Sequence, residues 1–453
     1  MTDIAFFDGR IVLKPGDCRD RLKELADNSV DAVVCDPPYA LTSIVKRFGS
    51  DGAAPATPKD GAAGAFARSS AGFMGKKWDT GDTAFAAEFW REVYRVLKPG
   101  GHVAAFSGTR TYHHLADAIE EAGFEIRDQL AWMYGTGFPK SHNVSKAIDK
   151  MLGAEREIIG TEIVANDMRN SGHLNVGKNG TRPAYERDIT ASGSPEAEEW
   201  EGWGTALKPA WEPICLARKP CMVPDENGKL RPATVAENVL YWGTGAINVG
   251  ACKIPAEKVT GWGGSAGGSR TNVCSPGDKS GTPRPSEGRF PANILHDGSP
   301  EVLAAFPVVE SGKPAGTKQG GNNNVFGQYG GGIAVTGFGD EGSAARFFYS
   351  AKADHDDRLG SKHPTVKPVD VMRWLVRLVC RKGGLVLDPF AGTGTTGAAA
   401  YWEGCDAVLV EWEEEYQGDI ERRMKLILAG PDERKRARTV AEPANGLPLF
   451  SPL

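Results

Sequence analysis

Hydrophobic and polar positions alternate near both ends of this chain in patterns that predict strands and helices in turn. Segments with strand-like patterns of apolar residues occupy residues 11–13, 32–35, 102–108, 124–134, 210–220, 385–388 and 406–412. Apolar residues recur at helical spacing over residues 18–26, 86–97, 112–123 and 369–384. The second helical pattern stops at Lys98-Pro99-Gly100-Gly101, since proline and glycine end helices. Strand and helix alternate, which is typical of a mainly parallel sheet covered by helices, so we expect an α/β fold.

The alternation fades between residues 141 and 345, where the segments at 261–269 and 320–332 are rich in glycine. Such segments cannot pack a core by themselves, so we expect loops there, or segments that a partner orders. The strand pattern at 207–220 still fits the main sheet. The sequence predicts four parts: two halves of one core, an insert between them and a disordered tail, at residues 1–140, 346–428, 141–345 and 429–453.

Composition places the chain among ordinary globular proteins, with 453 residues and a net charge of −5. No apolar run approaches the roughly 20 residues of a membrane helix, and the first residues lack the order of a secretory signal. We therefore expect a cytoplasmic protein with no membrane partner. The eight cysteines show neither C-x-x-C pairs nor histidines at metal-ligand spacing, so reduced thiols and no metal are expected.

A glycine turn follows the strand pattern at 385–388. Gly392-x-Gly394-x-x-Gly397 precedes Glu411 at the end of the next strand, as in a dinucleotide-binding turn. No Lys-Ser/Thr follows the glycines, so the turn is not a Walker loop. Glu411 suits the hydroxyls of a ribose. Asp388, at the tip of the first strand, would repel a pyrophosphate but would attract an ammonium group.

S-adenosylmethionine carries both a ribose and an ammonium group, so we expect it as the cofactor. Two alternatives remain open at this point. The turn could hold no ligand, or the chain could be a nicotinamide-dependent oxidoreductase, an interpretation that depends on the glycine spacing alone.

The apolar run at 32–35 leads directly into Asp36-Pro37-Pro38-Tyr39. An amino nitrogen on adenine or cytosine is a poor nucleophile, because its lone pair is drawn into the ring. A carboxylate and a backbone carbonyl that accept its two N–H groups would point the lone pair at a methyl donor. Asp36 supplies the carboxylate, prolines of fixed φ aim the Pro37 carbonyl, and Tyr39 offers a ring on which an extruded base stacks.

Taken together, the Asp-Pro-Pro-Tyr of residues 36–39 and the DPFAGTGTT of residues 388–396 closely resemble the amino-group DNA methyltransferases, which modify adenine N6 or cytosine N4. The base-handling motif precedes the cofactor turn, an order similar to that of the circularly permuted β class, and HPTVKP (363–368) matches a further motif of that class. Residues 207–220 are similar to segments of phage-type and actinobacterial members. The resemblance implies a Rossmann-like methyltransferase sheet, circularly permuted, with an inserted glycine-rich target-recognition region at 141–345.

The same resemblance assigns roles residue by residue. Asp36, Pro37, Pro38 and Tyr39 become the catalytic set. The cofactor-binding residues that it implies are Asp17 at the adenine, Glu411 at the ribose, Asp388, Phe390, Gly392, Gly394 and Thr395 at the methionine end, and Thr365 and Lys367 as helpers at the methionine carboxylate. Cys35 stands where the family more often has Thr or Ser.

Double-stranded DNA is the expected partner. Residues 46–77 carry six basic residues against two acids, directly after Tyr39, so we expect phosphate contacts there; a solvated loop is the alternative. The expected contact residues are Lys46, Arg47, Arg68, Lys76 and Lys77. At the other end of the chain, Leu447–Phe450 resembles the peptides that dock on bacterial sliding clamps, although Gly446 replaces the expected Gln; an apolar tail without a partner is the alternative.

The sequence therefore predicts a site-specific DNA methyltransferase of a restriction-modification type, acting in a bacterium or a phage-infected cell. Asp-Pro-Pro-Tyr favours adenine N6 over cytosine N4, which stays the alternative, and transfer is expected to be direct and in line. An inactive DNA-binding relative is less consistent with the complete motif set. The target sequence, a companion nuclease and the oligomeric state, a homodimer included, are left open.

Overall fold

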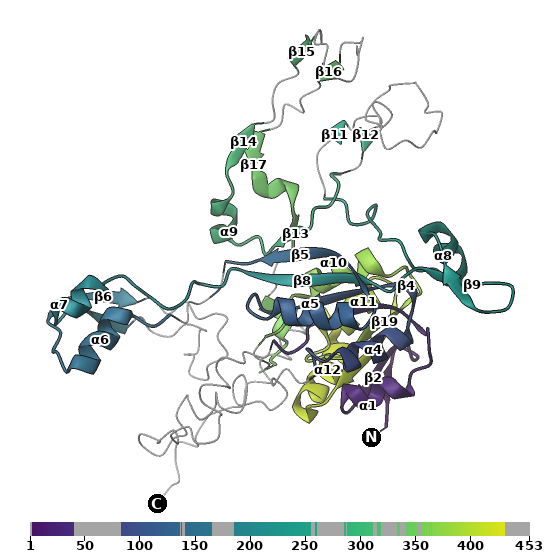
Figure 1. The fold of residues 1–453 in the computed structure, drawn as a ribbon, viewed down its shortest axis with the longest axis horizontal. Coiled ribbons are helices and arrows are strands. Elements are labelled where there is room, and N and C mark those ends of the chain that lie inside the picture. The colour runs from purple at the N-terminus through teal and green to yellow at the C-terminus, as the bar shows by residue number, and fades with distance from the viewer. Residues whose placement is uncertain are drawn as a thin grey trace, which may run out of the picture.

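The computed structural model describes residues 2–39, 83–135, 137, 141–164, 185–254, 259–260, 285–286, 288–310, 315–318, 333–335, 341–351, 355–361, 363 and 365–430. A ten-stranded sheet runs through the main body in the order β1-β2-β20-β19-β3-β4-β8-β5-β13-β18 (Figure 1). Its strands are β1 (Ile4–Phe6), β2 (Ile11–Pro15), β3 (Val30–Cys35), β4 (Leu97–Phe106), β5 (Glu125–Met133), β8 (Trp211–Arg218), β13 (Ile294–His296), β18 (Tyr349–Ser350), β19 (Leu385–Asp388) and β20 (Asp406–Glu411).

Most neighbouring strands of this sheet are parallel, as the sequence predicts. The exceptions are β1, at the edge, and β8, which is antiparallel to both β4 and β5. β8 belongs to the middle of the sequence, so the predicted core strand near 207–220 is confirmed. The predicted α/β, Rossmann-like class is confirmed as well.

Helices cover both faces of the sheet, because the central strands are apolar on both sides. In β3, Ala32 and Val34 pack with α10 (Val369–Val379) and α11 (Thr395–Trp402). Val33 and Cys35 pack on the other face with α4 (Ala87–Val96) and α5 (Tyr112–Glu121). All six residues of β3 are buried, which explains why its residues 32–35 form a continuous apolar run instead of an alternating one.

The two motifs that lie some 350 residues apart in the sequence follow adjacent strands. β19 pairs directly with β3 in parallel, with Val386 opposite Ala32 and Leu387 opposite Val33. Asp388 ends β19, and Asp36 directly follows β3. Both carboxylates therefore leave the same edge of the sheet, and the prediction that the distant ends of the chain share one cleft is confirmed.

Several predicted element boundaries are wrong. The pattern at 124–134 forms the strand β5, within one residue of the expected ends, but the predicted helix at 18–26 is the short α1 (Cys18–Arg21) followed by a 3₁₀ turn at Leu22–Glu24. β4 begins at Leu97 instead of 102, because Leu97 pairs with Val30 of β3 ahead of the Pro-Gly-Gly stretch, where the register shifts before pairing resumes at His102. α10 ends at Val379, five residues early, since Cys380 already adopts an extended backbone.

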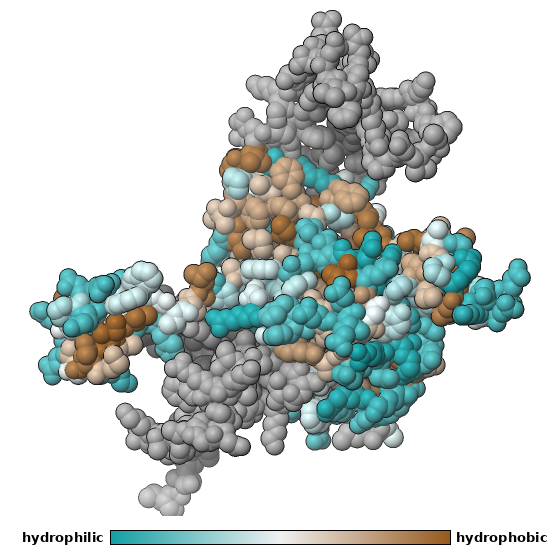
Figure 2. Space-filling model, in the orientation of Figure 1, coloured by the Kyte–Doolittle hydropathy of each residue, from teal (hydrophilic) through white to brown (hydrophobic). Residues whose placement is uncertain are grey.

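The middle of the sequence contributes small peripheral units. α6 (Val144–Leu152) and α7 (Pro195–Glu199) pack together beside the hairpin of β6 (Ile158–Val164) and β7 (Tyr185–Thr190), in a lobe set apart from the sheet (Figure 1). Apolar side chains gather on the visible face of this lobe (Figure 2). Ile159 and Ile163 are among the exposed large hydrophobic residues of β6.

Other peripheral elements of the middle sequence are β9 (Met222–Pro224), β10 (Leu230–Pro232), α8 (Val235–Trp242), β11 (Val259–Thr260), β12 (Pro285–Ser286), α9 (Pro300–Ala305), β14 (Val308–Glu310), β15 (Ala315–Lys318), β16 (Ile333–Val335) and β17 (Glu341–Ser343). A 3₁₀ turn at Ala344–Phe347, a second at His355–Arg358 and α12 (Glu414–Leu426) complete the described elements. Both glycine-rich segments and the predicted tail from 431 onward lie outside the described residues.

Gly397 fixes the distance between α11 and the sheet. A Cβ at this position would lie 2.6 Å from Leu409 Cδ1 and 3.3 Å from Met424 Cε. We expect Gly397→Ala to lower the free energy of unfolding by about 1–3 kcal/mol, because a packed core does not accept an added methyl group without displacement. Chemical denaturation measures this change.

Gly418→Ala is the matched control, since Gly418 lies inside α12 with open space around its Cα. Alanine there is expected to leave stability unchanged or to raise it by up to about 1 kcal/mol. Equal destabilisation by both substitutions would contradict the packing role of Gly397.

Candidate active site

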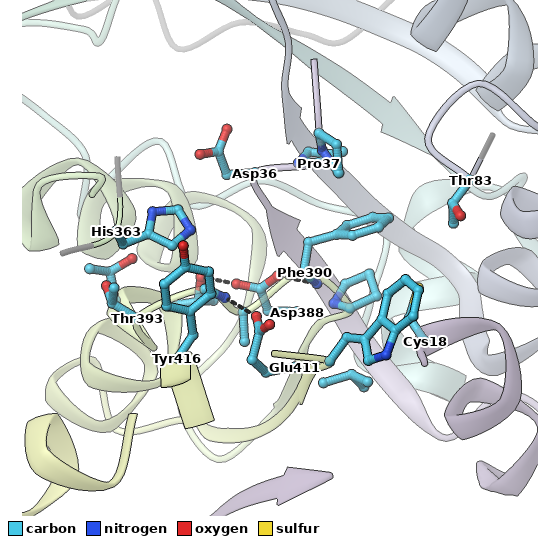
Figure 3. A pocket seen from close by; sticks show the side chains of 18 of the residues that line it. Cys18, Asp36, Pro37, Thr83, His363, Asp388, Phe390, Thr393, Glu411 and Tyr416 are labelled. Carbon is cyan, nitrogen blue, oxygen red and sulfur yellow. Dashed lines mark hydrogen bonds between the residues drawn. The ribbon is translucent and has the colours of Figure 1, made fainter. Parts of the chain in front are cut away.

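A cavity lies at the carboxyl ends of β3, β19 and β20, and both motifs line it (Figure 3). In a doubly wound sheet, ligands bind at this edge. The predicted residues that line the cavity are Asp17, Asp36, Pro37, Pro38, Tyr39, Thr365, Lys367, Asp388, Phe390, Gly392, Thr395 and Glu411. Gly394 does not line it; it is the residue before α11 and shapes the turn instead.

The glycine turn needs glycine at two positions. Gly392 and Gly394 have φ values of 52° and 77°, in the left-handed region that side chains disfavour. A Cβ on Gly394 would also meet Ile420 at 3.1 Å. The turn brings the Gly392 N–H to Glu411 Oε2 at 2.8 Å, which ties the loop after β19 to the end of β20.

Asp388 is a buried carboxylate at the tip of β19, with 2% of its surface exposed. Its Oδ1 accepts the Phe390 N–H at 3.0 Å, and its Oδ2 accepts the Thr396 hydroxyl at 2.5 Å. Burial raises its pKa to about 7, against these hydrogen bonds, which lower it. No cation pairs with Asp388 among the described residues.

Glu411 ends β20 and is nearly as buried, with 9% exposed. Its two oxygens accept the backbone N–H groups of Gly392 and Glu413, both at 2.8 Å. Burial raises its pKa to about 8, and the nearby Asp388 charge adds to this effect. A neutral ligand that donates hydroxyl protons would stabilise this carboxylate without requiring a charge, which suits a ribose.

Asp17 and Thr365 lie at the rim of the same cavity. Asp17 accepts the Arg19 N–H at 2.9 Å and pairs with the Arg19 guanidinium, and these contacts lower its pKa. It is therefore an ionised acceptor, as a contact to the adenine amino group requires. Thr365 adjoins His363 through a backbone N–H to Nδ1 hydrogen bond of 3.3 Å.

The Asp-Pro-Pro-Tyr turn is held from the segment between β4 and α5. The Thr111 hydroxyl, before α5, donates to the Tyr39 carbonyl at 2.9 Å. Asp36 Oδ1 is buried and has no hydrogen-bond partner among the described residues, while Oδ2 accepts from Lys367 Nζ at 2.6 Å. One carboxylate oxygen is thus paired with a cation of the described chain, and the other is not paired there.

Lys367 has other neighbours than the sequence predicts. Besides Asp36, its Nζ lies 3.1 Å from the Tyr39 hydroxyl and 3.2 Å from Glu212 Oε2. Burial would lower the pKa of this lysine, but the two carboxylates outweigh it and raise the pKa. In this structure Lys367 contacts the base-handling motif, so the expected place beside the methionine carboxylate stays a prediction.

Among the residues that sequence reasoning missed are His363, Thr396 and Tyr416, which line the cavity, and Glu212, which pairs with Lys367. His363 lies edge-on to Tyr416 with ring centroids 4.4 Å apart, and both line the cavity (Figure 3). Burial lowers the pKa of His363 to about 4, so it is neutral. Glu212 could have been identified from the sequence, because an acidic side chain near the start of a buried strand needs a partner for its charge.

The predicted DNA contacts Lys46, Arg47, Arg68, Lys76 and Lys77 lie outside the described residues, as do Leu447–Phe450. Among the described residues, no group of three or more His, Cys, Asp and Glu side chains is arranged to hold a metal ion. The helices within the described ranges are too short or too polar to cross a membrane.

Comparison with known proteins agrees with the geometry of the cleft. Residues 30–422 match the DNA methylase family N6_N4_Mtase, a stretch that covers most of the chain. The chain therefore belongs to this family of amino-group DNA methyltransferases. S-adenosylmethionine, predicted above from the residues, is the methyl donor of the family.

Individual relatives are more distant. The type II methyltransferase M.HpaI of Haemophilus parainfluenzae is 26% identical over 140 residues, 29% of this chain and 34% of that protein. M.HindIII of Haemophilus influenzae is 23% identical over 239 residues, 50% of this chain and 61% of that protein. The chain thus spans less than two thirds of each of these relatives. The solved structure of the cytosine-N4-specific PvuII DNA methyltransferase is 11% identical, with 95% of this chain and 91% of that chain covered and a TM-score of 0.38.

Proposed function

We propose that this protein is a site-specific DNA methyltransferase that transfers a methyl group from S-adenosylmethionine to adenine N6. The observation that carries the proposal is the direct pairing of β3 with β19. This pairing places Asp36 and Asp388, from the two motifs, on one cavity. Family membership supports methyl transfer to an amino group of DNA.

The cofactor half of the cavity fits S-adenosylmethionine, which when bound supplies an activated methyl group on a sulfonium. Asp388 would accept its ammonium, and Glu411 its ribose hydroxyls, since both carboxylates are buried without a cation among the described residues. Asp17 would accept from the adenine amino group. The apolar lining includes Phe390, which lies beside Asp388 (Figure 3). This apolar lining would exclude water from the methionine end of the cofactor.

The base half of the cavity presents an acceptor pair to an extruded nucleotide. Asp36 Oδ1 and the Pro37 carbonyl would accept the two amino protons, so that the nitrogen lone pair faces the donor. The Tyr39 ring would stack on the base. The transfer is direct and in line, and no covalent bond forms between the protein and the base.

Adenine is favoured over cytosine on the Asp-Pro-Pro-Tyr motif alone, and cytosine N4 is the second candidate. We place the chain in the β class, with permuted motif order and similarity to phage and actinobacterial members, and with target recognition in residues 141–345. Phosphate contacts are assigned to the basic stretch 46–77. The setting proposed is the cytoplasm of a bacterium or a phage-infected cell, with or without a companion nuclease.

Mapping modified bases tests this function. The gene would be expressed in a methylation-deficient host, and the host DNA would be read by single-molecule sequencing. We expect N6-methyladenine at one recurring sequence, absent from the Asp36→Ala strain. Marks on cytosine N4 would move the assignment to the second candidate, and unmodified DNA with soluble protein would contradict the enzyme proposal.

A thermal-shift comparison separates this proposal from an oxidoreductase. S-adenosylhomocysteine should raise the melting temperature, because Asp388 gains a cationic partner, and NAD should not, because Asp388 repels its pyrophosphate. Stabilisation by NAD alone would contradict the cofactor assignment.

A further inference from the structure

A buried ammonium lies between two carboxylates on the base side of the cleft. Lys367 Nζ is 2.6 Å from Asp36 Oδ2 and 3.2 Å from Glu212 Oε2, and the lysine is 5% exposed. The three groups come from the turn after β3, the strand β8 and the segment before α10. Glu212 is thus contributed by the middle of the sequence, outside both motifs.

The surroundings hold this cluster in one arrangement. The Tyr39 hydroxyl donates to Glu212 Oε2 at 3.0 Å, and Lys367 Nζ lies 4.9 Å from the centroid of the buried Phe106 ring. Glu212 also helps to raise the pKa of the neighbouring Tyr134 hydroxyl, after the larger effect of burial, so that phenol stays neutral. A charge cluster in such an apolar setting interacts more strongly than one in water.

The formal charges of the cluster sum to −1, from two carboxylates and one ammonium. If Lys367 faced Asp36 alone, the pair would be neutral, and the carboxylate that receives the base would be weakened as an acceptor. Because Glu212 shares the ammonium, Asp36 keeps acceptor strength at Oδ1, the oxygen without a partner in the described chain. Positive charge develops on the amino nitrogen during methyl transfer, so a net negative cluster stabilises the transition state.

We propose that Glu212 is a positioning residue for the methyl-transfer step, which acts through Lys367 to keep Asp36 oriented and negative toward the target base. This inference rests on the proposed function and deepens it. Lys367 is accordingly assigned to the base-handling half of the cleft. Glu212 itself need not touch the base or the cofactor.

The first test is the isosteric Glu212→Gln variant in single-turnover methyl transfer. Unmethylated genomic DNA and tritiated cofactor are used with enzyme in excess. We expect the rate at saturating cofactor to fall about tenfold or more, while the affinity for S-adenosylhomocysteine and the KM for DNA stay within about twofold. A merely structural role would change binding and melting temperature together with the rate.

Glu125→Gln is the matched control. Glu125 pairs with Arg218 at 2.6 Å on β5 and β8, the same pair of strands, but at the other end of β8 from Glu212. It should leave the transfer rate unchanged. A Glu212→Gln rate equal to that of the wild type would overturn the inference, whereas a wild-type protein without any methyl transfer would overturn the proposed function and the inference with it.

A second test uses charge rescue. Lys367→Met removes the donor that holds Asp36 Oδ2 and leaves Asp36 and Glu212 to repel each other with a charge of −2. Asp36 is then no longer oriented toward the base, so we expect a loss of activity larger than that of Glu212→Gln. Adding Glu212→Gln to Lys367→Met restores −1 and should recover about tenfold of the rate. A double variant no faster than Lys367→Met would contradict the charge-sharing role.

Discussion

Asp36→Ala should lower methyl transfer by about a thousandfold or more, while the protein still folds and binds S-adenosylhomocysteine. The loss of a single preorganised hydrogen-bonding group in an active site costs roughly 10²–10³ in rate, and Asp36 also carries charge. The fold should tolerate the change, because Lys367 keeps Glu212 as a partner at 3.2 Å. Single-turnover assays measure the rate of methyl transfer, and a thermal shift with S-adenosylhomocysteine measures whether the protein folds and binds the ligand.

Asp36→Asn sharpens the same prediction, since it keeps the shape and removes the charge. Lys367 Nζ would donate its hydrogen bond to the single side-chain oxygen of the asparagine. The amide NH₂ would then face the amino group of the base. Two donors would then oppose each other, and we expect Asn to be nearly as inactive as Ala. Asp406 lies at the end of β20 opposite to Glu411 and the cavity, where it pairs with Arg10 at 3.2 Å. Asp406→Asn is the control and should be fully active. Activity near the wild-type level in Asp36→Asn would rule out a carboxylate-acceptor mechanism.

The chemistry of this cleft is more predictable from the sequence than its surroundings are. Asp36 and Asp388 each end a buried apolar run, and the carboxyl ends of parallel strands meet at one edge of a sheet. That rule predicts adjacent strands from the two motifs alone, and β3 and β19 do pair. Local patterns are sufficient here because each motif is contiguous and each strand is buried on both faces.

The partners of these motifs could not be predicted, because they depend on tertiary contacts. Lys367 lies in a motif, yet nothing in the sequence tells which carboxylate its long side chain reaches. Glu212 reaches Lys367 only because β8 is antiparallel between β4 and β5, which brings the start of β8 to the carboxyl end of β4. Strand direction within an insert is a property of the whole sheet, and local patterning does not encode it.

Some predicted element boundaries were wrong for a related reason. Proline and glycine at 99–101 predicted that the strand starts after them, but β4 already begins at Leu97, which pairs with Val30; the register then shifts and pairing with β3 resumes at His102. Pairing with a neighbouring strand outweighed local propensity. The small strands and helices of the middle sequence were missed because short elements carry weak periodicity.

The buried Asp388 imposes a cost on the ligand-free fold that depends on pH. Its pKa of about 7 in the folded protein lies above the 3.8 of an unfolded aspartate. Between these values the folded state holds a proton that the unfolded state releases, so stability falls as pH rises from about 4 to 7. Above pH 7 the ionised carboxylate destabilises the ligand-free protein by up to about 4 kcal/mol.

Asp388→Asn should therefore stabilise the ligand-free protein above pH 7 and abolish tight cofactor binding. Asparagine keeps both hydrogen bonds, because its oxygen accepts from the Phe390 N–H and its amide donates to the Thr396 hydroxyl oxygen. The melting temperature at pH 8.5 should rise by a few degrees, with no gain below pH 4. Without the carboxylate, the cofactor ammonium has no counter-charge, so affinity should fall about a hundredfold.

Melting curves across pH, with and without S-adenosylhomocysteine, check both effects on the same samples. In the wild type, stabilisation by this ligand should grow as pH rises through 7, because the ionised form of Asp388 is the one that binds the ammonium. In Asp388→Asn that growth should disappear. Gln in place of Glu411 is a poorer probe, since both Glu411 oxygens accept backbone N–H groups and an amide would oppose one of them. An Asn variant less stable than the wild type at pH 8.5 would show that the buried, ionised Asp388 does not destabilise the ligand-free protein. It would also contradict the role given to Asp388 in cofactor binding.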